Sequence, residues 1–203
     1  MPTYKLHYFN MRARGELSRL IFAHANVPYE DCRYEMSEWA EQKSKMPFGQ
    51  LPVLEVDGKM LAQSHTMGRY LARKFGLAGK DEWEQAQADM YVDCVNDIMN
   101  AARASVMETD PEKQKELFQT YIGEQVVPHV QLIEKQLRKN GTGYLVGSSV
   151  TWADLAYYSF FSFLLERCPD MLKDTPHFKR LLSTVENIPQ IKKWIETRPK
   201  TPM

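Results

Sequence analysis

Hydrophobic positions in the first third of the chain alternate between two periods. Residues 4–8 alternate apolar and polar side chains as a half-buried strand does, whereas the apolar positions of residues 17–25 recur at helical spacing. A polar-edged strand is predicted over residues 29–35, and a weak helical pattern follows it. Asp57-Gly58 separates two further apolar runs and is a strong hairpin signal.

A second strong helical pattern closes this part, beginning at Ser64 and stopping at Gly76. The predicted order of elements is therefore βαβαββα. Strands separated by a helix favour a parallel pair, and the hairpin adds an antiparallel edge.

Beyond Asp81 the chain shows long helical patterns and almost no strand signal. The first runs from Asp81 to about Met107 and is predicted to place Trp83, Met90, Cys94 and Ile98 on one face. The others cover residues 111–138, with a kink near Pro128, residues 151–168, residues 177–186 and residues 188–197. The segment from Thr151 is apolar almost all round, which predicts a central helix. We therefore expect an α/β domain over residues 1–78 and an all-helical domain over residues 81–203.

Composition narrows the class of protein. The 203 residues carry a formal net charge of zero, which gives no reason to expect nucleic acid or an anionic membrane as partner. The start lacks the pattern of a signal peptide, and no apolar run reaches the roughly 20 residues of a membrane span. Cys32, Cys94 and Cys168 lie far apart, which indicates neither a disulfide framework nor a zinc site. We expect a cytoplasmic protein.

Tyr8, at the end of the first predicted strand, has two interpretations. It could be an ordinary strand tyrosine with a buried ring and a wet hydroxyl. It could instead donate to a substrate atom, with Arg14 nearby at the start of a helix, where the helix end adds positive potential. No cysteine lies at this helix start, which argues against a disulfide oxidoreductase.

Three other polar patterns are open to a structural interpretation. Ser64 is predicted to cap its own helix, although the same helix end could also bind a carboxylate. Asp89, Asp93 and Asp97 form an acidic stripe that, in isolation, is best interpreted as a solvated surface. Thr151 and Asp154 have capping-box spacing and are expected to stabilise the central helix.

Four motifs together resemble the glutathione transferase superfamily, and they span the chain: "LHYFNMRARGE", "GQLPVLEVDG", "QSHTMGRYLAR" and "TWADLAYY". A tyrosine followed by arginine and Gly-Glu is most similar to the sigma class, and the nematode sequences of that kind are the most similar. The resemblance implies a thioredoxin-like first domain, a homodimer and glutathione as cosubstrate. It also implies that Tyr8 and Arg14 are catalytic and stabilise the glutathione thiolate.

The resemblance assigns further residues to glutathione. It implies a cis peptide between Leu51 and Pro52, so that the backbone of Leu51 pairs with the cysteinyl part. The γ-glutamyl carboxylate is assigned to the helix end at Ser64, and Asp97 is expected to reach the partner subunit's glutathione. The complete set of assigned glutathione contacts is Tyr8, Trp39, Lys43, Gln50, Leu51, Pro52, Gln63, Ser64 and Asp97.

The resemblance also bears on metals and on the second substrate. Asn96 stands where related prostaglandin enzymes carry the middle of three acids, so no metal is expected. Ala104 replaces a large aromatic of those enzymes, which favours a more open pocket for hydrophobic electrophiles. The residues assigned to that pocket are Phe9, Met11, Ala13, Met99, Ala104, Trp152 and Ala156.

The resemblance favours a homodimeric sigma-class glutathione transferase, and two alternatives are kept beside that function. The favoured function is detoxification, in which glutathione thiolate attacks hydrophobic electrophiles and organic or lipid hydroperoxides. The first alternative is glutathione-dependent isomerisation to prostaglandin D. The second is non-catalytic: carriage of haem or another hydrophobic ligand, or a crystallin-like structural role. Retention of Tyr8, Arg14, Gln63 and Ser64 together favours an enzyme.

Overall fold

The computed structural model describes residues 2–201, which fold into two compact units. One unit runs to Ala78 and resumes at Glu186, and the other spans Gly79–Val185. The sequence-based division differs, because it placed everything from residue 81 onwards in one helical domain. The reason for the difference is that the last helix, α10 (Pro189–Thr197), packs against α1 (Glu16–Ala25) of the first unit.

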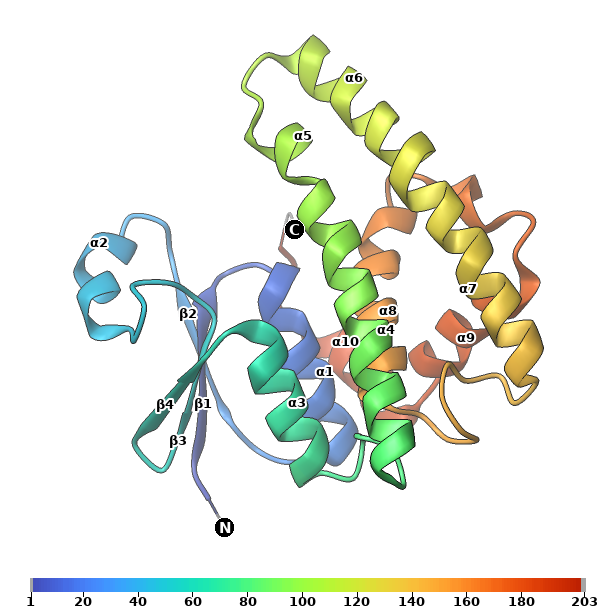
Figure 1. Ribbon diagram of the computed structural model, residues 1–203. Helices are drawn as coiled ribbons and strands as arrows, with labels where there is room; N and C mark the ends of the chain where they lie inside the picture. Colours follow the sequence, from blue (N-terminus) through green and yellow to red (C-terminus); the bar gives the residue numbers. More distant parts are fainter. Residues whose placement is uncertain (1, 202–203) are drawn as a thin grey trace. The chain divides into compact units, whose positions relative to one another are not determined.

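The first unit is built on a four-stranded sheet with strand order β2-β1-β3-β4 (Figure 1). β1 pairs in parallel with β2, whereas β1–β3 and β3–β4 are antiparallel. The predicted βαβ unit and the hairpin at Asp57-Gly58 are therefore both confirmed. The strands are β1 (Tyr4–Phe9), β2 (Glu30–Tyr34), β3 (Val53–Val56) and β4 (Lys59–Ala62).

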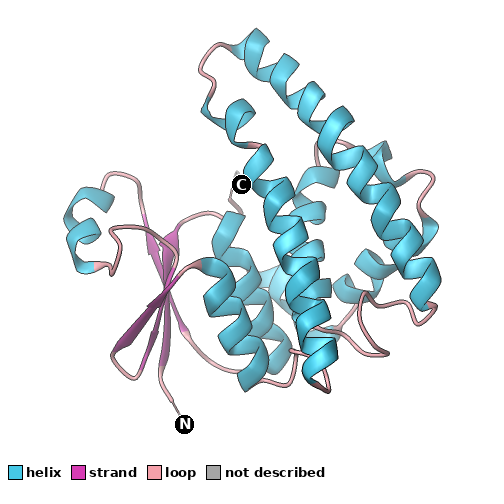
Figure 2. Cartoon of the chain, in the orientation of Figure 1, coloured by secondary structure: helices cyan, strands magenta, loops and turns pink. Residues whose placement is uncertain are grey.

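The helices of the first unit give the sheet one well-covered face. Leu6 and Leu54 are fully buried, and α1 and α3 (Ser64–Lys74) pack against each other on one side of the sheet (Figures 1 and 2). Alternation along β1 sends Tyr4, Leu6 and Tyr8 to the buried interior. The short helices of this unit are η1 (Ala13–Gly15), α2 (Trp39–Gln42) and η2 (Lys43–Lys45).

The second unit is helical throughout its described secondary structure (Figure 2). Its centre is α8 (Trp152–Leu165), as the all-round apolar pattern predicted. This helix carries most of the unit's buried aromatic residues and packs against α4 (Glu82–Ala101). The elements are α4 (Glu82–Ala101), α5 (Arg103–Met107), α6 (Pro111–Tyr121), η3 (Ile122–Val126), α7 (Val127–Asn140), α8 (Trp152–Leu165), η4 (Pro169–Leu172) and α9 (Pro176–Glu186).

The apolar face predicted for α4 was wrong. Trp83 is 73% exposed and Met90 is 50% exposed, so these side chains do not form the core of this chain. The buried face is instead Ala88, Tyr91, Val92 and Val95, and the Tyr91 ring meets the edge of Tyr157 from α8. Two apolar stripes compete on this helix, and packing against α8 decides between them.

The long helical patterns are also interrupted at points that the periodicity alone does not mark. α4 and α5 are separate helices that meet at Ala102. Between α6 and α7 the chain forms one π-helical turn, η3, which ends two residues before Pro128. Proline lacks the N–H that would bond to the preceding turn, so the predicted kink near Pro128 takes the form of this widened turn. None of the helices described over residues 2–201 is long and apolar enough to cross a membrane.

Candidate active site

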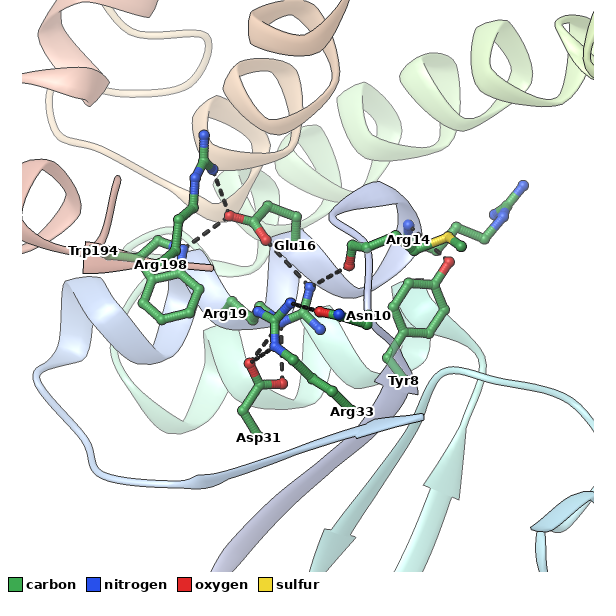
Figure 3. A network of polar contacts seen from close by, with 10 residues as sticks. Tyr8, Asn10, Arg14, Glu16, Arg19, Asp31, Arg33, Trp194 and Arg198 are labelled. Atoms are coloured by element: carbon green, nitrogen blue, oxygen red, sulfur yellow. Dashed lines mark hydrogen bonds and ion pairs between the residues drawn. The ribbon is translucent and has the colours of Figure 1, made fainter. Parts of the chain in front are cut away.

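Tyr8 lies at the end of β1 with only 5% of its surface exposed. Its hydroxyl oxygen accepts a hydrogen bond from the backbone N–H of Arg14 at 3.2 Å (Figure 3). Because a tyrosine hydroxyl has one proton of its own, this arrangement leaves that proton for another acceptor. The ring is therefore buried, as in the first interpretation of Tyr8, and donation from its hydroxyl to a substrate atom stays a prediction.

Opposing influences act on the Tyr8 hydroxyl. Burial raises its pKa, while the Arg14 N–H bond and the charges of Arg14 and Arg19 lower it, and burial prevails. The hydroxyl therefore stays protonated near neutral pH and has a proton to donate. The same cations favour negative charge on any atom that accepts this proton.

The loop that holds Arg14 is tightly constrained. Ala13 has φ +30°, an unusual backbone for a non-glycine residue, and the turn from Ala13 to Gly15 is a 3₁₀ helix. A Cβ atom added to Gly15 would lie 2.5 Å from Cδ1 of Tyr8. The glycine in the Gly15-Glu16 motif is therefore required for close packing between the loop and the ring.

The peptide between Leu51 and Pro52 is cis, as the resemblance implied. Pro52 is buried and Leu51 is partly exposed, directly before β3. The pairing of the Leu51 backbone with glutathione stays a prediction.

The N-terminus of α3 is not capped as predicted. Ser64 is the first residue of this helix rather than its cap, and the N-cap position is Gln63, whose side chain makes no capping hydrogen bond. No acidic residue lies in the first turn. Gln63 has φ +73°, a conformation that non-glycine residues rarely adopt and that concentrates at functional sites. A helix N-terminus with no side-chain cap from its N-cap residue is a place where proteins bind anions, and binding of a carboxylate at this end of α3 stays a prediction.

The remaining glutathione candidates of the first unit lie around α2. The Trp39 ring meets the Phe9 ring edge-on, with centroids 5.5 Å apart. Lys43 and Gln50 are exposed, and the aliphatic stem of Lys43 lies beside Gly49. All candidates except Asp97 therefore belong to the first unit.

The other predicted residues are divided between the two units. Phe9, Met11 and Ala13 belong to the first unit. Met99 and Ala104 show exposed surface, whereas Trp152 and Ala156 are buried in α8. Asp97 is exposed on α4. The electrophile pocket and the reach of Asp97 across a dimer both stay predictions.

The predicted capping box at the start of α8 is confirmed. Asp154 accepts from the Thr151 N–H at 2.7 Å and from the Thr151 hydroxyl at 3.0 Å. Its other oxygen accepts from the Leu145 N–H at 2.9 Å, which ties the preceding loop to the helix. This motif is structural, as expected.

A buried ion network was not predicted from the sequence. It lies under the loop of residues 10–15 between β1 and α1, which we call the Tyr8 loop. Arg19 is completely buried and Glu16 is 2% exposed, although both are charged residues on α1. The only signal in the sequence was their spacing. Glu16 and Arg19 are three residues apart, which places them on one face of a helix that is otherwise apolar. Their partners come from β2 and from the C-terminal segment, which no local pattern links to α1.

No cluster of three or more metal-ligating side chains is found in the described part of the chain.

Two family models match the sequence that builds this geometry. "Glutathione S-transferase, N-terminal domain" matches residues 4–73, and "Glutathione S-transferase, C-terminal domain" matches residues 96–198. The chain belongs to the glutathione S-transferase family.

Individual relatives agree with this assignment. Glutathione S-transferase 1 of Ascaris suum is 45% identical over the full length of both chains. Human hematopoietic prostaglandin D synthase is 40% identical, with 99% of each chain covered. The solved structure of a monomeric glutathione S-transferase from the hookworm Necator americanus has a TM-score of 0.89 and 39% identity, and it covers 99% of this chain and 100% of its own.

These findings confirm four predictions. The family, the thioredoxin-like domain followed by helices, the transferase activity and glutathione as cosubstrate all hold for this transferase. The similarity to nematode enzymes and to prostaglandin D synthase is also confirmed.

Proposed function

We propose that this transferase conjugates glutathione to small hydrophobic electrophiles, and that the Tyr8 hydroxyl stabilises the thiolate that attacks them. The supporting observation is the hydrogen bond from the Arg14 N–H to the Tyr8 oxygen, which leaves the hydroxyl proton for the sulfur. A free thiol has a pKa near about 8.5, and only its thiolate is a strong nucleophile. Donation to sulfur favours the thiolate and so raises its fraction at neutral pH.

The rest of glutathione is assigned to the first unit. The uncapped N-terminus of α3, with Ser64 and Gln63, receives the γ-glutamyl carboxylate. The Leu51 backbone pairs with the cysteinyl part, while Trp39, Lys43 and Gln50 contact the glycyl end. Lys43 acts there as a point charge for a carboxylate.

The chemistry follows from the thiolate. Its sulfur attacks an electrophilic carbon, a carbon–sulfur bond forms, and the leaving group departs with the bonding pair. With an organic hydroperoxide the sulfur attacks the terminal oxygen, the O–O bond breaks, an alcohol leaves after protonation, and glutathione sulfenic acid forms. The thiol of a second glutathione then attacks this sulfur, so that a disulfide forms and water leaves. This sequence gives the peroxidase activity that we assign to the same site.

The Tyr8→Phe variant tests the proposal. Loss of one charge-assisted hydrogen bond costs about 1.5–3 kcal/mol, so kcat for a chlorinated nitrobenzene should fall roughly 10- to 150-fold at neutral pH. Glutathione should still bind, and the activity should recover towards pH ~8.5, where the thiol ionises unaided.

Tyr29→Phe is the matched control for Tyr8→Phe. Tyr29 also belongs to the first unit, and its buried hydroxyl has no hydrogen-bond partner within residues 2–201. This variant should keep the wild-type rate and pH profile. An unchanged rate in the Tyr8→Phe variant would remove Tyr8 from the mechanism.

Isomerisation to prostaglandin D is the second candidate, because a prostaglandin D synthase is 40% identical to this chain. Incubation with the prostaglandin endoperoxide and analysis of the products decide this point. A single D-type product formed only with glutathione would support the isomerase, and a mixture equal to that of the uncatalysed reaction would exclude it.

We further propose a cytoplasmic homodimer in which Asp97 reaches the partner subunit's glutathione amine. Exposure of Asp97 on α4 is compatible with such a contact. All three cysteines are unpaired, which suits a reducing compartment.

A further inference from the structure

A network of buried charges lies beneath the Tyr8 loop, and its centre is Arg19 (Figure 3). The Arg19 Nε donates to both oxygens of Asp31 at 3.2 Å, and its Nη1 donates to the carbonyl oxygen of Met11 at 2.7 Å. The same nitrogen lies 3.4 Å from Glu16 Oε2. Burying a guanidinium costs desolvation free energy. The number of polar partners that offset this cost indicates that Arg19 holds the groups around it in fixed positions.

Arg19 interacts with two groups that position the Tyr8 hydroxyl: the Tyr8 ring and the loop that carries Arg14. Its guanidinium carbon lies 5.9 Å from the centroid of the Tyr8 ring. Its bond to the Met11 carbonyl fixes the loop three residues before Arg14, whose N–H donates to the Tyr8 oxygen. The segment from Met11 to Gly15 is therefore held at one end by Arg19 and at the other by Tyr8.

The C-terminal segment joins the network through Glu16. Glu16 Oε1 accepts from the Trp194 indole N–H at 2.9 Å and from Arg198 Nη1 at 2.7 Å. Its other oxygen faces Arg19. Trp194 and Arg198, which lie 178 and 182 positions after Glu16 in the sequence, thus hold the carboxylate beside the Arg19 guanidinium.

We propose that Arg19 is a positioning residue for the Tyr8 hydroxyl, and that Trp194 and Arg198 keep it in place through Glu16. In this scheme the C-terminal segment contributes to activation of the glutathione thiol, because it holds the residues that position the Tyr8 hydroxyl. This inference rests on the proposed role of Tyr8. Arg19 touches no substrate atom in this scheme; it acts by holding the loop that carries the Arg14 N–H.

Arg198→Met and Trp194→Phe test the proposal. Trp194→Phe keeps an aromatic ring and removes the N–H donor. The readout is the pKa of enzyme-bound glutathione, followed by the ultraviolet absorbance of its thiolate and by the pH profile of kcat/KM. Both variants should shift that pKa upwards by roughly half a unit to one unit, which corresponds to a three- to tenfold loss of thiolate at lower pH. The KM for glutathione should stay within about twofold, because these residues contact no part of it.

Two comparisons make the outcome decisive. Lys192→Met removes an exposed cation from the same helix, α10, and should leave the thiol pKa unchanged. Arg19→Lys keeps the charge and loses the planar fork, so it should shift the pKa at least as far as Arg198→Met does. If Arg19→Lys does not fold, Trp194→Phe alone carries the test.

A purely structural network would lower the melting temperature of Arg198→Met and Trp194→Phe without moving the thiol pKa, and that result would overturn the inference. Tyr8→Phe, measured alongside, separates the two proposals. A raised thiol pKa in Tyr8→Phe together with wild-type values in the network variants leaves the Tyr8 role intact and removes only the role of Arg19. A wild-type thiol pKa in Tyr8→Phe removes the role of Tyr8 itself.

Discussion

At the scale of single residues, the tightest contact of the candidate site lies between Gly15 and the Tyr8 ring. Gly15→Ala would bring a methyl group to 2.5 Å from Cδ1 of Tyr8, so the ring or the loop must shift. We expect a loss of about 1–3 kcal/mol of stability by overpacking. We also expect kcat to fall about tenfold or more, since a displaced hydroxyl loses its aim at the sulfur. Thermal unfolding and steady-state kinetics measure the two effects.

Gly123→Ala is the control for this substitution. Gly123 lies in the helical turn η3, and a Cβ added there would meet nothing within 4 Å. Stability should stay the same or rise by up to about 1 kcal/mol, as for glycine replaced by alanine in a helix. Equal activity in the two alanine variants would contradict the steric argument at Gly15.

At the scale of elements, the start of α9 is held by a carboxylate from α7. Glu134 accepts from the backbone N–H groups of His177 and Phe178 and pairs with the His177 ring at 2.6 Å. Burial alone would raise the pKa of Glu134, but the hydrogen bonds from His177 and Phe178 outweigh it and leave the pKa below its usual value. Its stabilising effect is therefore present above pH ~4.5 and is lost as the pH falls through the lowered pKa.

Glu134→Gln tests this pH dependence. The variant should lose about 1 kcal/mol of unfolding free energy at pH 7, because a neutral amide accepts these bonds less strongly. Denaturant unfolding should show the difference shrinking towards zero in acid, where the wild-type carboxylate is protonated. Glu116→Gln, at an exposed position of α6, should match the wild type at every pH. A difference for Glu134→Gln that is constant with pH would contradict the assigned role of charge.

At the scale of the whole molecule, the prediction concerns assembly. We expect sedimentation to give twice the mass of one chain, and we expect Asp97→Asn to raise the KM for glutathione several-fold while kcat changes little. The physical reason is that loss of one charge from the partner subunit weakens binding of the glutathione amine equally in the ground state and in the transition state. The hookworm relative described as monomeric supplies the contrast. A single-chain mass with wild-type kinetics in Asp97→Asn would refute the dimeric site.

Much of the fold was predictable because its signals are local. The hairpin at Asp57-Gly58, the parallel unit around α1 and the capping box of Thr151 and Asp154 each depend on residues close together in the sequence. The predicted cap of α3 failed because the side-chain pattern does not show the backbone angle at the helix start. Ser64 seemed suited to a cap but begins its helix, because Gln63 takes a positive φ at the junction between β4 and α3.

The candidate site divides in the same way. The motif around Tyr8 and Arg14 predicted a strand end followed by a helix start, which the structure confirms, but the same motif gave no indication of a buried Arg19. Burial of a charge is decided by what surrounds it, and here those groups are Asp31 from β2 and Glu16 held by the C-terminal segment.

The sequence by itself determined the order of strands and helices, the place of Tyr8 in the first strand and the membership of a glutathione-dependent family, because each rests on short motifs with local physical meaning. Only the tertiary structure decided which face of α4 is buried, that α10 packs with the first unit, and that Arg19 lies beneath the Tyr8 loop. These features depend on contacts between residues up to 182 positions apart, and no local pattern encodes such contacts.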